Sequence, residues 1–345
     1  MKAVYIESHG GPEVLTYGDR PDPVIQPHEV LVRVRATSLN RLDVYTRAGV
    51  RGTRREFPPP LVLGGDAAGD IVEVGSGTRS LKVGDRVVVN PKITCGRCSS
   101  CLAVQDDLCV KFGMLGSAVD GSHAELVKVP ESNALPIPDG VSFEEAAAVP
   151  TTYLPVWNIL IRRAQLKPSE TALVLSASAG VGTAAVQVAK AVVGARVIAT
   201  TSTAEKADKA LALGADQVID YTQEDIAARI KELTDDQGVD VVVDHVGAEF
   251  FQAAYSSLKP GGKYGICGVT TGYRAELQMG LLFTRNLTVF GVFMGSKQDM
   301  GQIVEMLGQG KIKPAIHQVF PMEQAAEAHR MMEERSFFGK LVLTP

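Results

Sequence analysis

Between residues 171 and 268 the chain alternates short apolar runs with helix-forming segments, and this alternation restricts the possible folds more than any other feature. The apolar runs lack the alternating polar residues of a half-exposed strand, which is typical of parallel strands buried on both faces. Parallel neighbours need a crossover connection, usually a helix. The sequence therefore predicts a doubly wound parallel α/β sheet. We expect strands at 171–176, 195–201, 217–221, 239–247, 263–268 and 287–295, and helices at 180–193, 203–213, 224–234 and 249–258.

The first 140 residues have a different pattern, with short β-branched runs separated by frequent glycine and proline. The runs at 29–39 and 85–93 are typical of strands, and long helices are not expected before residue 142. Ser142, followed three residues later by Glu145, forms the pattern of a capping box at a helix start. The sequence therefore predicts an all-β domain before the α/β domain. We expect the last segment of the chain to return to this first domain.

Length and charge exclude several classes of protein. A chain of 345 residues with 45% hydrophobic and 21% charged residues has the size and balance of a two-domain globular enzyme. A net charge of −4 and the lack of a basic run argue against nucleic acid as a partner. No apolar stretch reaches 18 residues and no signal peptide begins the sequence, so we expect no membrane partner and a cytoplasmic location.

A turn of small residues separates the first apolar run of the α/β region from its first helix. Such a turn lets backbone N–H groups approach a pyrophosphate at the helix N-terminus. The candidate residues are Ala179, Gly180, Val181 and Gly182. An ordinary tight turn is the alternative, but the repeated strand–helix units behind it favour a dinucleotide site.

The end of the second apolar run predicts which dinucleotide binds. A site for NAD usually carries an acidic residue about 20 residues after the glycines, where it binds the ribose 2′-hydroxyl. Here Thr201 and Ser202 stand in that place, and Lys206 follows. Hydroxyl groups and a lysine suit the 2′-phosphate of NADPH, which an acid would repel. NADPH is therefore the predicted cofactor; for Lys206, a solvated helix position is the alternative.

Four of the five cysteines lie in one short segment, at a spacing of two, two and seven intervening residues. In a reducing compartment this spacing is more typical of a metal site than of disulfides. The predicted ligands are Cys95, Cys98, Cys101 and Cys109. The fifth cysteine, Cys267, falls in a predicted buried strand and is expected to be inert.

Several motifs resemble those of the medium-chain dehydrogenase/reductase superfamily over essentially the whole chain. They are LGGDAAGDIVEVG, VGDRVV, CGRCSSC with Cys109, ASAGVGTAAVQVAK, LGADQVIDY and VVDHVG. The resemblance implies a GroES-like catalytic domain at 1–145 with a metal lobe at 93–110, an NADP-binding Rossmann domain at 146–295, and a return to the catalytic domain at 296–345. It also implies an active site in the cleft between the two domains.

The resemblance separates the two metals that zinc-dependent alcohol dehydrogenases carry. One is a structural zinc on four cysteines at the spacing seen here, and four thiolates leave a tetrahedral ion no open position. An iron–sulfur cluster is the alternative, but its last gap is shorter and a proline follows it. The catalytic zinc ligands would fall at Asn40, at Gly65 and in VPTTYLPVW, which has no cysteine. We therefore expect one structural Zn²⁺ and no catalytic metal.

Without a catalytic metal, the resemblance points to the branch similar to quinone oxidoreductase and enone or enoyl reductases. That branch has the pattern Asn-x-x-Asp-x-Tyr, which Asn40, Asp43 and Tyr45 match. Reducing an activated C=C bond requires a hydrogen-bond donor at the carbonyl oxygen rather than a metal-bound alkoxide. We assign Asn40 to hydrogen bonding of substrate or nicotinamide, and Tyr45 to donor or proton source. A packed cleft wall is the alternative for Tyr45.

Other positions match residues that contact the cofactor in relatives. Those along the nicotinamide are Thr152, His245, Val246, Gly268 and Val269, and those beside the 2′-phosphate are Tyr221 and Arg335. Hydride delivery requires no base, so His245 is assigned to lining the cofactor, with a packed histidine as its alternative.

Three functions remain open. The first is NADPH-dependent reduction of a quinone, an enone or another activated alkene. The second is an alcohol dehydrogenase whose unusual metal shell consists of Asp43, Asp66 and His123, although we interpret His123 as structural. The third is a non-enzymatic role that keeps the NADPH site.

Two further expectations concern the substrate and the assembly. Arg51, Arg54 and Arg55 follow the candidate catalytic segment and are suited to the phosphates of an acyl-coenzyme A thioester, such as an acryloyl or enoyl ester. A solvated loop is the alternative for these arginines. The strand expected at 286–293 would end the sheet at an open edge, which relatives pair with a second copy, so we expect a homodimer or homotetramer.

Overall fold

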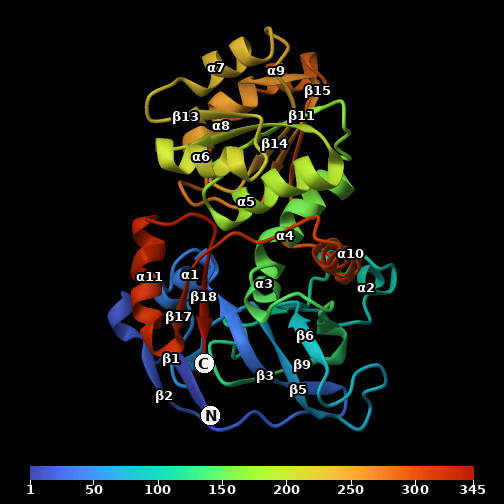
Figure 1. Cartoon of the computed structure of the whole chain (residues 1–345), viewed down its shortest axis with the longest axis vertical. Coiled ribbons are helices and arrows are strands. Elements are labelled where there is room, and N and C mark those ends of the chain that lie inside the picture. Colours follow the sequence, from blue (N-terminus) through green and yellow to red (C-terminus); the bar gives the residue numbers. More distant parts are fainter. The chain divides into compact units, whose positions relative to one another are not determined.

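The structure is a computed structural model that describes residues 1–345, and it divides into two compact units. The first unit consists of Met1–Thr151, Ser296–Gly308 and Ile316–Pro345. The second unit consists of Thr152–Gly295 and Gln309–Ala315 (Figure 1). None of the helices has the length and apolarity that crossing a membrane requires.

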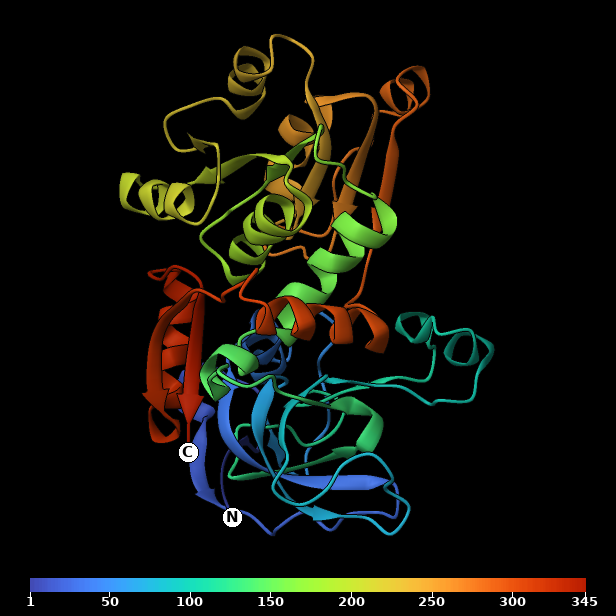
Figure 2. The same cartoon turned by 45° about the vertical axis from the view of Figure 1, so that its right-hand side comes forward.

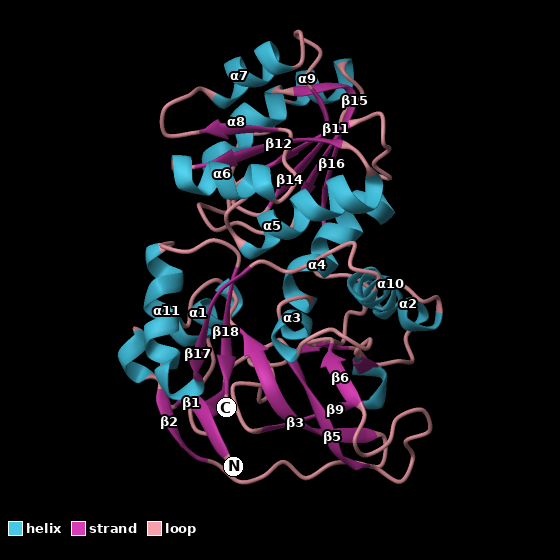
Figure 3. Cartoon of the chain, in the orientation of Figure 1, coloured by secondary structure: helices cyan, strands magenta, loops and turns pink.

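The second unit contains a six-stranded sheet in which every pair of neighbours is parallel, in the order β13-β12-β11-β14-β15-β16. Its helices lie on both faces of the sheet (Figure 3). The predicted doubly wound fold is therefore confirmed. Its strands are β11 (Thr171–Val174), β12 (Arg196–Thr201), β13 (Gln217–Asp220), β14 (Val239–Asp244), β15 (Leu258–Ile266) and β16 (Thr288–Gly291). Its helices are α5 (Gly180–Gln187), which continues as a π-helix over Val188–Val193, α6 (Ala204–Ala212), α7 (Ile226–Leu233), α8 (Ala248–Ser256) and α9 (Met279–Thr284).

Burial explains why the strands of this sheet read as unbroken apolar runs. All six residues of β14 are buried, and both faces of the central strands are covered. Each fully buried valine, leucine or isoleucine contributes about 1.5–3 kcal/mol relative to exposure. The expected strand at 239–247 ends earlier, at Asp244, because the carboxylate of Asp244 accepts hydrogen bonds from the backbone N–H groups of Val246 and Gly247 and turns the chain away.

The first unit is built on mainly antiparallel sheets, as expected for a GroES-like domain, with one parallel pair, β17 and β18. A seven-stranded sheet has the order β10-β6-β5-β3-β18-β17, with β9 also paired to β3; β2-β1-β4 and β7-β8 form smaller sheets. The strands from the N-terminal part are β1 (Lys2–Ile6), β2 (Thr16–Asp19), β3 (Glu29–Ser38), β4 (Leu61–Val62), β5 (Ala67–Val74), β6 (Arg86–Val89), β7 (Lys92–Ile93), β8 (Gly113–Met114), β9 (Leu126–Pro130) and β10 (Ala134–Pro136). The helices there are α1 (Arg41–Ala48), α2 (Ser99–Leu102) and α3 (Phe143–Ala147), and α4 (Pro150–Trp157) crosses from this unit into the second.

The C-terminal segment completes the seven-stranded sheet. It supplies α10 (Lys297–Gly308), β17 (Ile316–Pro321), α11 (Ala325–Glu334) and β18 (Lys340–Thr344). β18 pairs antiparallel with β3, with Val342 opposite Ser38. In Figure 2 these last strands, in red, lie beside the blue strands from the start of the chain. The last residues of the chain therefore reach the point where β3 ends and α1 begins.

Sequence analysis did not predict α1, although local signals for it are present. Asn40 and Asp43 form the pattern of a capping box at its start, and the backbone N–H of Asn40 donates to the carboxylate of Asp43 at 2.7 Å. Gly49 ends the helix in the left-handed conformation, with φ of 68°, which glycine adopts without strain. The helix has only eight residues, too few for an apolar periodicity to be evident.

Candidate functional site

The candidate catalytic residue Asn40 lies at the junction of β3 and α1, and its amide is held on both sides. Its Nδ2 group donates to the backbone oxygen of Ser38 at 3.2 Å and to Oδ2 of Asp66 at 2.8 Å. Its Oδ1 accepts from Nζ of Lys340 at 2.6 Å. Both amide hydrogens are thus used within the first unit, and the two ends of the amide are distinguished by their partners.

Asp66 and Lys340 form the charged centre of this arrangement. Asp66 is fully buried, and Lys340 on β18 is 3% exposed. Nζ of Lys340 lies 3.5 Å from Oδ2 of Asp66 and also donates to the backbone oxygen of Leu39 at 3.0 Å. We call this group the Lys340 cluster; it consists of Ser38, Asn40, Asp43, Asp66, Thr151 and Lys340. Sequence analysis missed Lys340, because no local pattern marks a lysine at the start of a C-terminal strand.

Asp43 is the second buried carboxyl of the Lys340 cluster. It is 2% exposed, and one of its oxygens accepts a hydrogen bond of 2.7 Å from the backbone N–H of Asn40. Burial raises the pKa of Asp43 to about 7; the hydrogen bond from Asn40 opposes this shift. This side chain is therefore close to half protonated at neutral pH.

Tyr45 and the arginines after it have different environments. The guanidinium carbon of Arg51 lies 4.8 Å from the centre of the Tyr45 ring, a cation–π arrangement. Arg54 is exposed, and Arg55 is half-buried over Phe57. Arg47, in contrast, lies inside α1, is 1% exposed and pairs with Glu333. Arg51, Arg54 and Arg55 therefore remain the candidates for binding a phosphate.

The four clustered cysteines converge in the segment 93–110, which we call the cysteine lobe. Their Sγ atoms all lie within 4.8 Å of one another. Separations of 3.9, 3.5 and 3.6 Å join Cys95 to Cys101, Cys98 to Cys101 and Cys95 to Cys109. Sulfur atoms at about 2.3 Å from one tetrahedral zinc lie about 3.8 Å apart. The spacing read from the sequence thus corresponds to a compact four-sulfur group.

The pKa values of the thiols in the cysteine lobe also favour a bound cation. Backbone N–H groups of Arg97 and Cys98 lower the pKa of Cys95 to about 6. Burial and neighbouring thiols raise the pKa of Cys101 to about 12. Four thiolates cannot form side by side without a positive charge among them, and a zinc ion would supply it.

The predicted dinucleotide turn in the second unit has a free helix N-terminus and a tight approach. Ala179 is the N-cap of α5, and its side chain cannot accept a hydrogen bond. The first backbone N–H groups of the helix therefore have no side-chain cap. A Cβ on Gly182 would lie 2.2 Å from the backbone oxygen of Ser176, so only glycine fits there. These features suit a pyrophosphate.

The end of β12 places a buried hydroxyl beside this turn. Thr201 is 1% exposed and its Oγ1 has no hydrogen-bond partner within the protein. The neighbouring Thr200 accepts a hydrogen bond from the backbone N–H of Ser176 at 2.9 Å, which ties β12 to the turn. Ser202 and Lys206 follow and are half-buried. The ring of Tyr221 packs edge-on against Phe250 at 4.9 Å.

The ends of β14 and β15 bring further predicted positions to the same edge of the sheet. Nε2 of His245 lies 3.3 Å from the backbone oxygen of Ser176. A Cβ on Gly268 would lie 2.5 Å from the backbone oxygen of His245, so the loop that follows β15 passes close to the end of β14. Burial lowers the pKa of His245, which keeps the ring neutral and fits a lining role rather than a base. The remaining positions in this unit are Thr152, Val246 and Val269, whereas Arg335 lies in the first unit at the end of α11.

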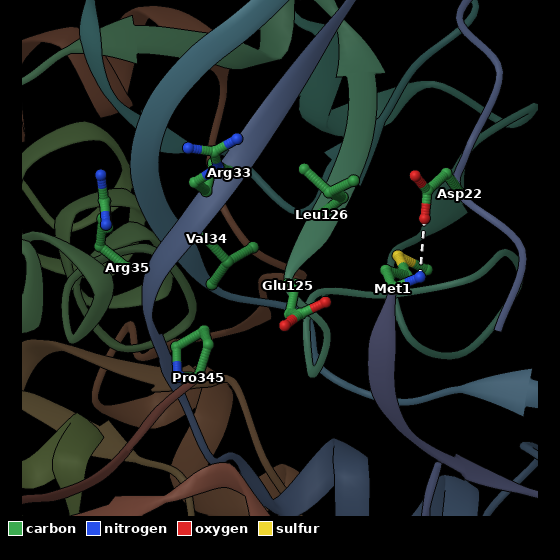
Figure 4. A pocket seen from close by; sticks show the side chains of 8 residues that line it. All are labelled: Met1, Asp22, Arg33, Val34, Arg35, Glu125, Leu126 and Pro345. Atoms are coloured by element: carbon green, nitrogen blue, oxygen red, sulfur yellow. Dashed lines mark hydrogen bonds and ion pairs between the residues drawn. The ribbon is translucent and has the colours of Figure 1, made fainter. Parts of the chain in front are cut away.

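A pocket of about 420 Å³ in the first unit is separate from all these residues (Figure 4). Its charged groups are largely paired: the N-terminal ammonium of Met1 with Asp22 at 2.7 Å, and Arg35 with Asp70 at 2.6 Å. None of the predicted site residues lines it.

Two family profiles match the chain: the alcohol dehydrogenase GroES-like domain over residues 26–139, and zinc-binding dehydrogenase over residues 180–309. The chain is 33% identical to an NAD-dependent alcohol dehydrogenase of Saccharolobus solfataricus, with 100% of both covered. It is also 33% identical to a quinone oxidoreductase of Pseudomonas aeruginosa, with 100% of this chain and 99% of that protein covered. The chain belongs to the medium-chain dehydrogenase/reductase superfamily.

Other members of the superfamily extend this comparison. An acryloyl-coenzyme A reductase of Metallosphaera sedula is 31% identical, with 100% of both covered. Among solved structures, an NAD-dependent alcohol dehydrogenase matches with a TM-score of 0.95 and 43% identity over 100% of both chains. An Escherichia coli quinone oxidoreductase in complex with NADPH matches with a TM-score of 0.84 and 29% identity over 100% of both chains. The chain is an oxidoreductase of this superfamily, and its own residues must distinguish between these activities.

The residues present do not fit the catalytic zinc of the superfamily's alcohol dehydrogenases. At the expected positions stand Asn40, whose amide is engaged, and Gly65, which has no side chain. A Cβ at Gly65 would meet no atom closer than 3.5 Å, so a ligand is absent here although space for one exists. The four cysteines are the one group of three or more His, Cys, Asp or Glu side chains placed to hold a metal. A metal shell of Asp43, Asp66 and His123 therefore has no support in the structure.

Proposed function

We propose that the protein is an NADPH-dependent reductase that delivers hydride to an activated C=C bond or a quinone, with no metal at the reacting atoms. The observation that supports this most is the Lys340 cluster, because it engages both ends of the amide of Asn40, which stands at a position where a zinc-dependent relative would need a ligand. A quinone or enone already carries an electron-poor carbon. Its reduction therefore needs charge stabilisation rather than alkoxide formation.

We assign the cofactor to the second unit. When bound, NADPH supplies the hydride. The N-terminus of α5 at Gly180, Val181 and Gly182 would hold its pyrophosphate, and the unpaired hydroxyl of Thr201 would bind the adenosine ribose. Ser202, Lys206 and Tyr221 of this unit would bind the 2′-phosphate; Arg335, predicted at the same phosphate, belongs to the first unit. His245, Val246, Gly268, Val269 and Thr152 would line the nicotinamide.

In the first unit, we assign the remaining chemistry to α1. The Tyr45 phenol would donate to the substrate carbonyl oxygen or return a proton to the reduced product, and the neighbouring Arg51 charge would favour an anionic oxygen there. Asn40 has no amide hydrogen left for substrate, so its contribution is to hold the start of α1 in place. The cysteine lobe would bind one structural zinc, remote from this chemistry.

A second candidate is reduction of an acyl-coenzyme A thioester, favoured by the acryloyl-coenzyme A reductase relative and by the arginines after α1. Arg51, Arg54 and Arg55 would pair with the coenzyme phosphates. An enoyl-CoA ester should then have a KM at least about tenfold below that of the same acyl group on a short thiol. Replacing Arg54 and Arg55 by alanine, with Arg51 kept beside Tyr45, should reduce that difference strongly and leave reduction of a small quinone unchanged. Equal KM values for both esters in the wild type would rule this candidate out.

The test of the proposed function is a substrate panel that follows NADPH oxidation with quinones, enones, enoyl-CoA esters and aldehydes, and NADP⁺ reduction with alcohols. Turnover should occur with the electron-poor alkenes or quinones, and chelators that leave the cysteine lobe loaded should not reduce it. Turnover of alcohols alone, together with two tightly bound zinc ions per chain, would contradict the proposal.

We also propose a homodimer, or a homotetramer built from it, that pairs through β16. This strand is the edge of the six-stranded sheet, and in α9 nearby Met279 and Phe283 are 72% and 74% exposed. An open edge and exposed apolar side chains favour association. Sizing with light scattering at micromolar concentration should give at least twice the chain mass of 36.7 kDa.

A further inference from the structure

The Lys340 cluster contains a lysine in a setting where lysine is rarely found. Its ammonium is buried, donates to the backbone oxygen of Leu39 and to Oδ1 of Asn40, and forms an ion pair with Oδ2 of Asp66 at 3.5 Å. Removing a charged group from water is unfavourable unless partners of this kind replace the water. The site therefore holds a cation of its own, fixed in position by a strand.

The pairing of β18 with β3 positions Lys340 independently of the contacts that its side chain makes. In the pairing of β18 with β3, Val342 lies opposite Ser38 and Leu343 opposite Thr37. The backbone N–H of Leu39 also donates to the oxygen of Leu341 at 2.9 Å. This register brings Lys340 alongside the residue at which β3 gives way to α1. A lysine here is therefore presented to the start of α1 by the sheet.

Asp66 is saturated by its partners. Its Oδ1 accepts from the backbone N–H and the hydroxyl of Thr151, at 3.0 and 2.7 Å. Its Oδ2 accepts from the hydroxyl of Ser38 at 2.7 Å and from the amide of Asn40. A carboxylate offers about four lone-pair positions, and these four donors use them. No position remains for coordination of a metal ion.

We propose that Lys340 is the resident cation of this site: it takes the charge role of a metal ion, closes Asp66 and Asn40 to metal binding, and positions Asn40 at the start of α1. Lys340 is thus a positioning residue, since it touches no reacting atom in this assignment. The kinetic consequence rests on the proposed function. The structural consequences, charge coupling and exclusion of a second metal, do not.

The charge coupling can be measured by unfolding. Lys340→Met removes the ammonium and keeps most of the volume, leaving Asp66 buried without a countercharge. Asp66→Asn removes the other charge, and the double variant removes both. The double-mutant cycle should give a coupling of at least about a hundredfold in the unfolding equilibrium constant, because each single variant leaves an uncompensated buried charge.

The exposed pair Lys2–Asp19, joined at 2.9 Å, gives the matched control. Its cycle with Lys2→Met and Asp19→Asn should show a coupling below about fivefold, as surface pairs do. If Lys340→Met alone fails to fold, recovery of folding in the double variant gives the same answer. Lys340→Met with wild-type stability, or a cycle no larger than that of the control, would overturn the proposal.

Metal content provides an independent measurement. After incubation with excess Zn²⁺ and dialysis, the wild type should retain one zinc per chain. A second tightly bound zinc in the wild type would show that the ammonium does not close the site, and would overturn the proposal.

Kinetics test the positioning role. Lys340→Met should lower kcat for the best alkene or quinone at least about tenfold with little change in KM, and Lys340→Arg should recover part of it.

The charges facing Asp43 are Asp66 and Lys340, with Asn40 and Gly64 as hydrogen-bond donors. Loss of the ammonium should therefore move the acid limb of the kcat/KM profile to higher pH. Unchanged kcat and profile in folded Lys340→Met would refute the positioning role. If the wild type reduces no such substrate, the proposed function fails, while the unfolding and metal measurements still decide the charge role.

Discussion

The cysteine lobe and the Lys340 cluster both gather ligand-type side chains in the first unit, but they assemble in opposite ways. The four sulfurs come from 15 consecutive positions, Cys95 to Cys109, and the cation that we propose for them would come from outside the chain. The Lys340 cluster combines β3, α1, the start of β5, α4 and β18, and 300 residues separate Asn40 from the lysine that supplies its positive charge. One site is a local sequence motif. The other is a product of the fold.

The comparison predicts that the cysteine lobe is essential for local structure but not for chemistry. Cys98→Ser should lose the zinc and destabilise the protein by several kcal/mol, because structural zinc contributes directly to folding. Folded molecules should keep their turnover per bound cofactor. Metal analysis and urea unfolding measure the first effect, and kcat normalised to cofactor binding measures the second.

Cys267→Ser is the matched control, since it changes a cysteine outside the lobe, in the second unit. It should leave zinc content unchanged. Abolished turnover in folded, zinc-free Cys98→Ser protein would end the division between the two regions.

Lowering the pH should reduce the free energy of unfolding through His123, which is buried near Lys340, more steeply than through a surface histidine. His123 is fully buried, neither of its ring nitrogens has a hydrogen-bond partner, and burial, together with the charge of Lys340, lowers its pKa to about 3. The unfolded chain has a histidine pKa of about 6.5 and binds the proton first. Stability is therefore present above pH of about 6.5 and lost as the pH falls from there towards 3.

His123→Phe keeps an aromatic ring and removes this titration. Between pH 6.5 and 5 the wild type should lose about 2 kcal/mol of unfolding free energy relative to the variant, at equal zinc loading. His28→Gln, at an exposed position, should follow the wild type. Parallel stability curves for wild type and His123→Phe would show that the imidazole is not held neutral by the fold.

These regions also show what the sequence could reveal. The six-stranded sheet was predictable because its strands are buried on both faces and leave an apolar signature in the chain. The cysteine lobe was predictable because its ligands are neighbours. Both leave their signal in segments shorter than about 30 residues, the range over which periodicity and spacing are visible, although the strands that pair can be further apart, as Ala172 and Val241 are.

The Lys340 cluster was not predictable, for the opposite reason. Lys340 precedes an apolar strand and resembles any lysine at a strand start; only the antiparallel register of β18 with β3 gives it a role. The role of Arg47 was not predictable either, because only the helical phase of α1 turns it inward to Glu333 and His329. The sequence matched Asn40 to a family pattern, while the use of its two amide hydrogens follows only from the assembled contacts.

Lys206 lies between the two extremes. A local motif predicted it as a phosphate ligand, but its place on a helix also fits a solvated side chain. It follows β12 in the first turn of α6, where its backbone N–H is capped by the hydroxyl of Thr203. If its ammonium binds the 2′-phosphate, Lys206→Ala should weaken NADPH binding about tenfold and leave NADH unchanged, because only NADPH carries that phosphate. Lys209→Ala, one turn further on in a surface pair with Glu205 at 2.6 Å, is the control and should change neither affinity. Fluorescence titration of both cofactors measures the effect. Equal losses for NADPH and NADH would make Lys206 a solvated helix residue, and the cofactor preference would then depend on Thr201, Ser202 and Tyr221.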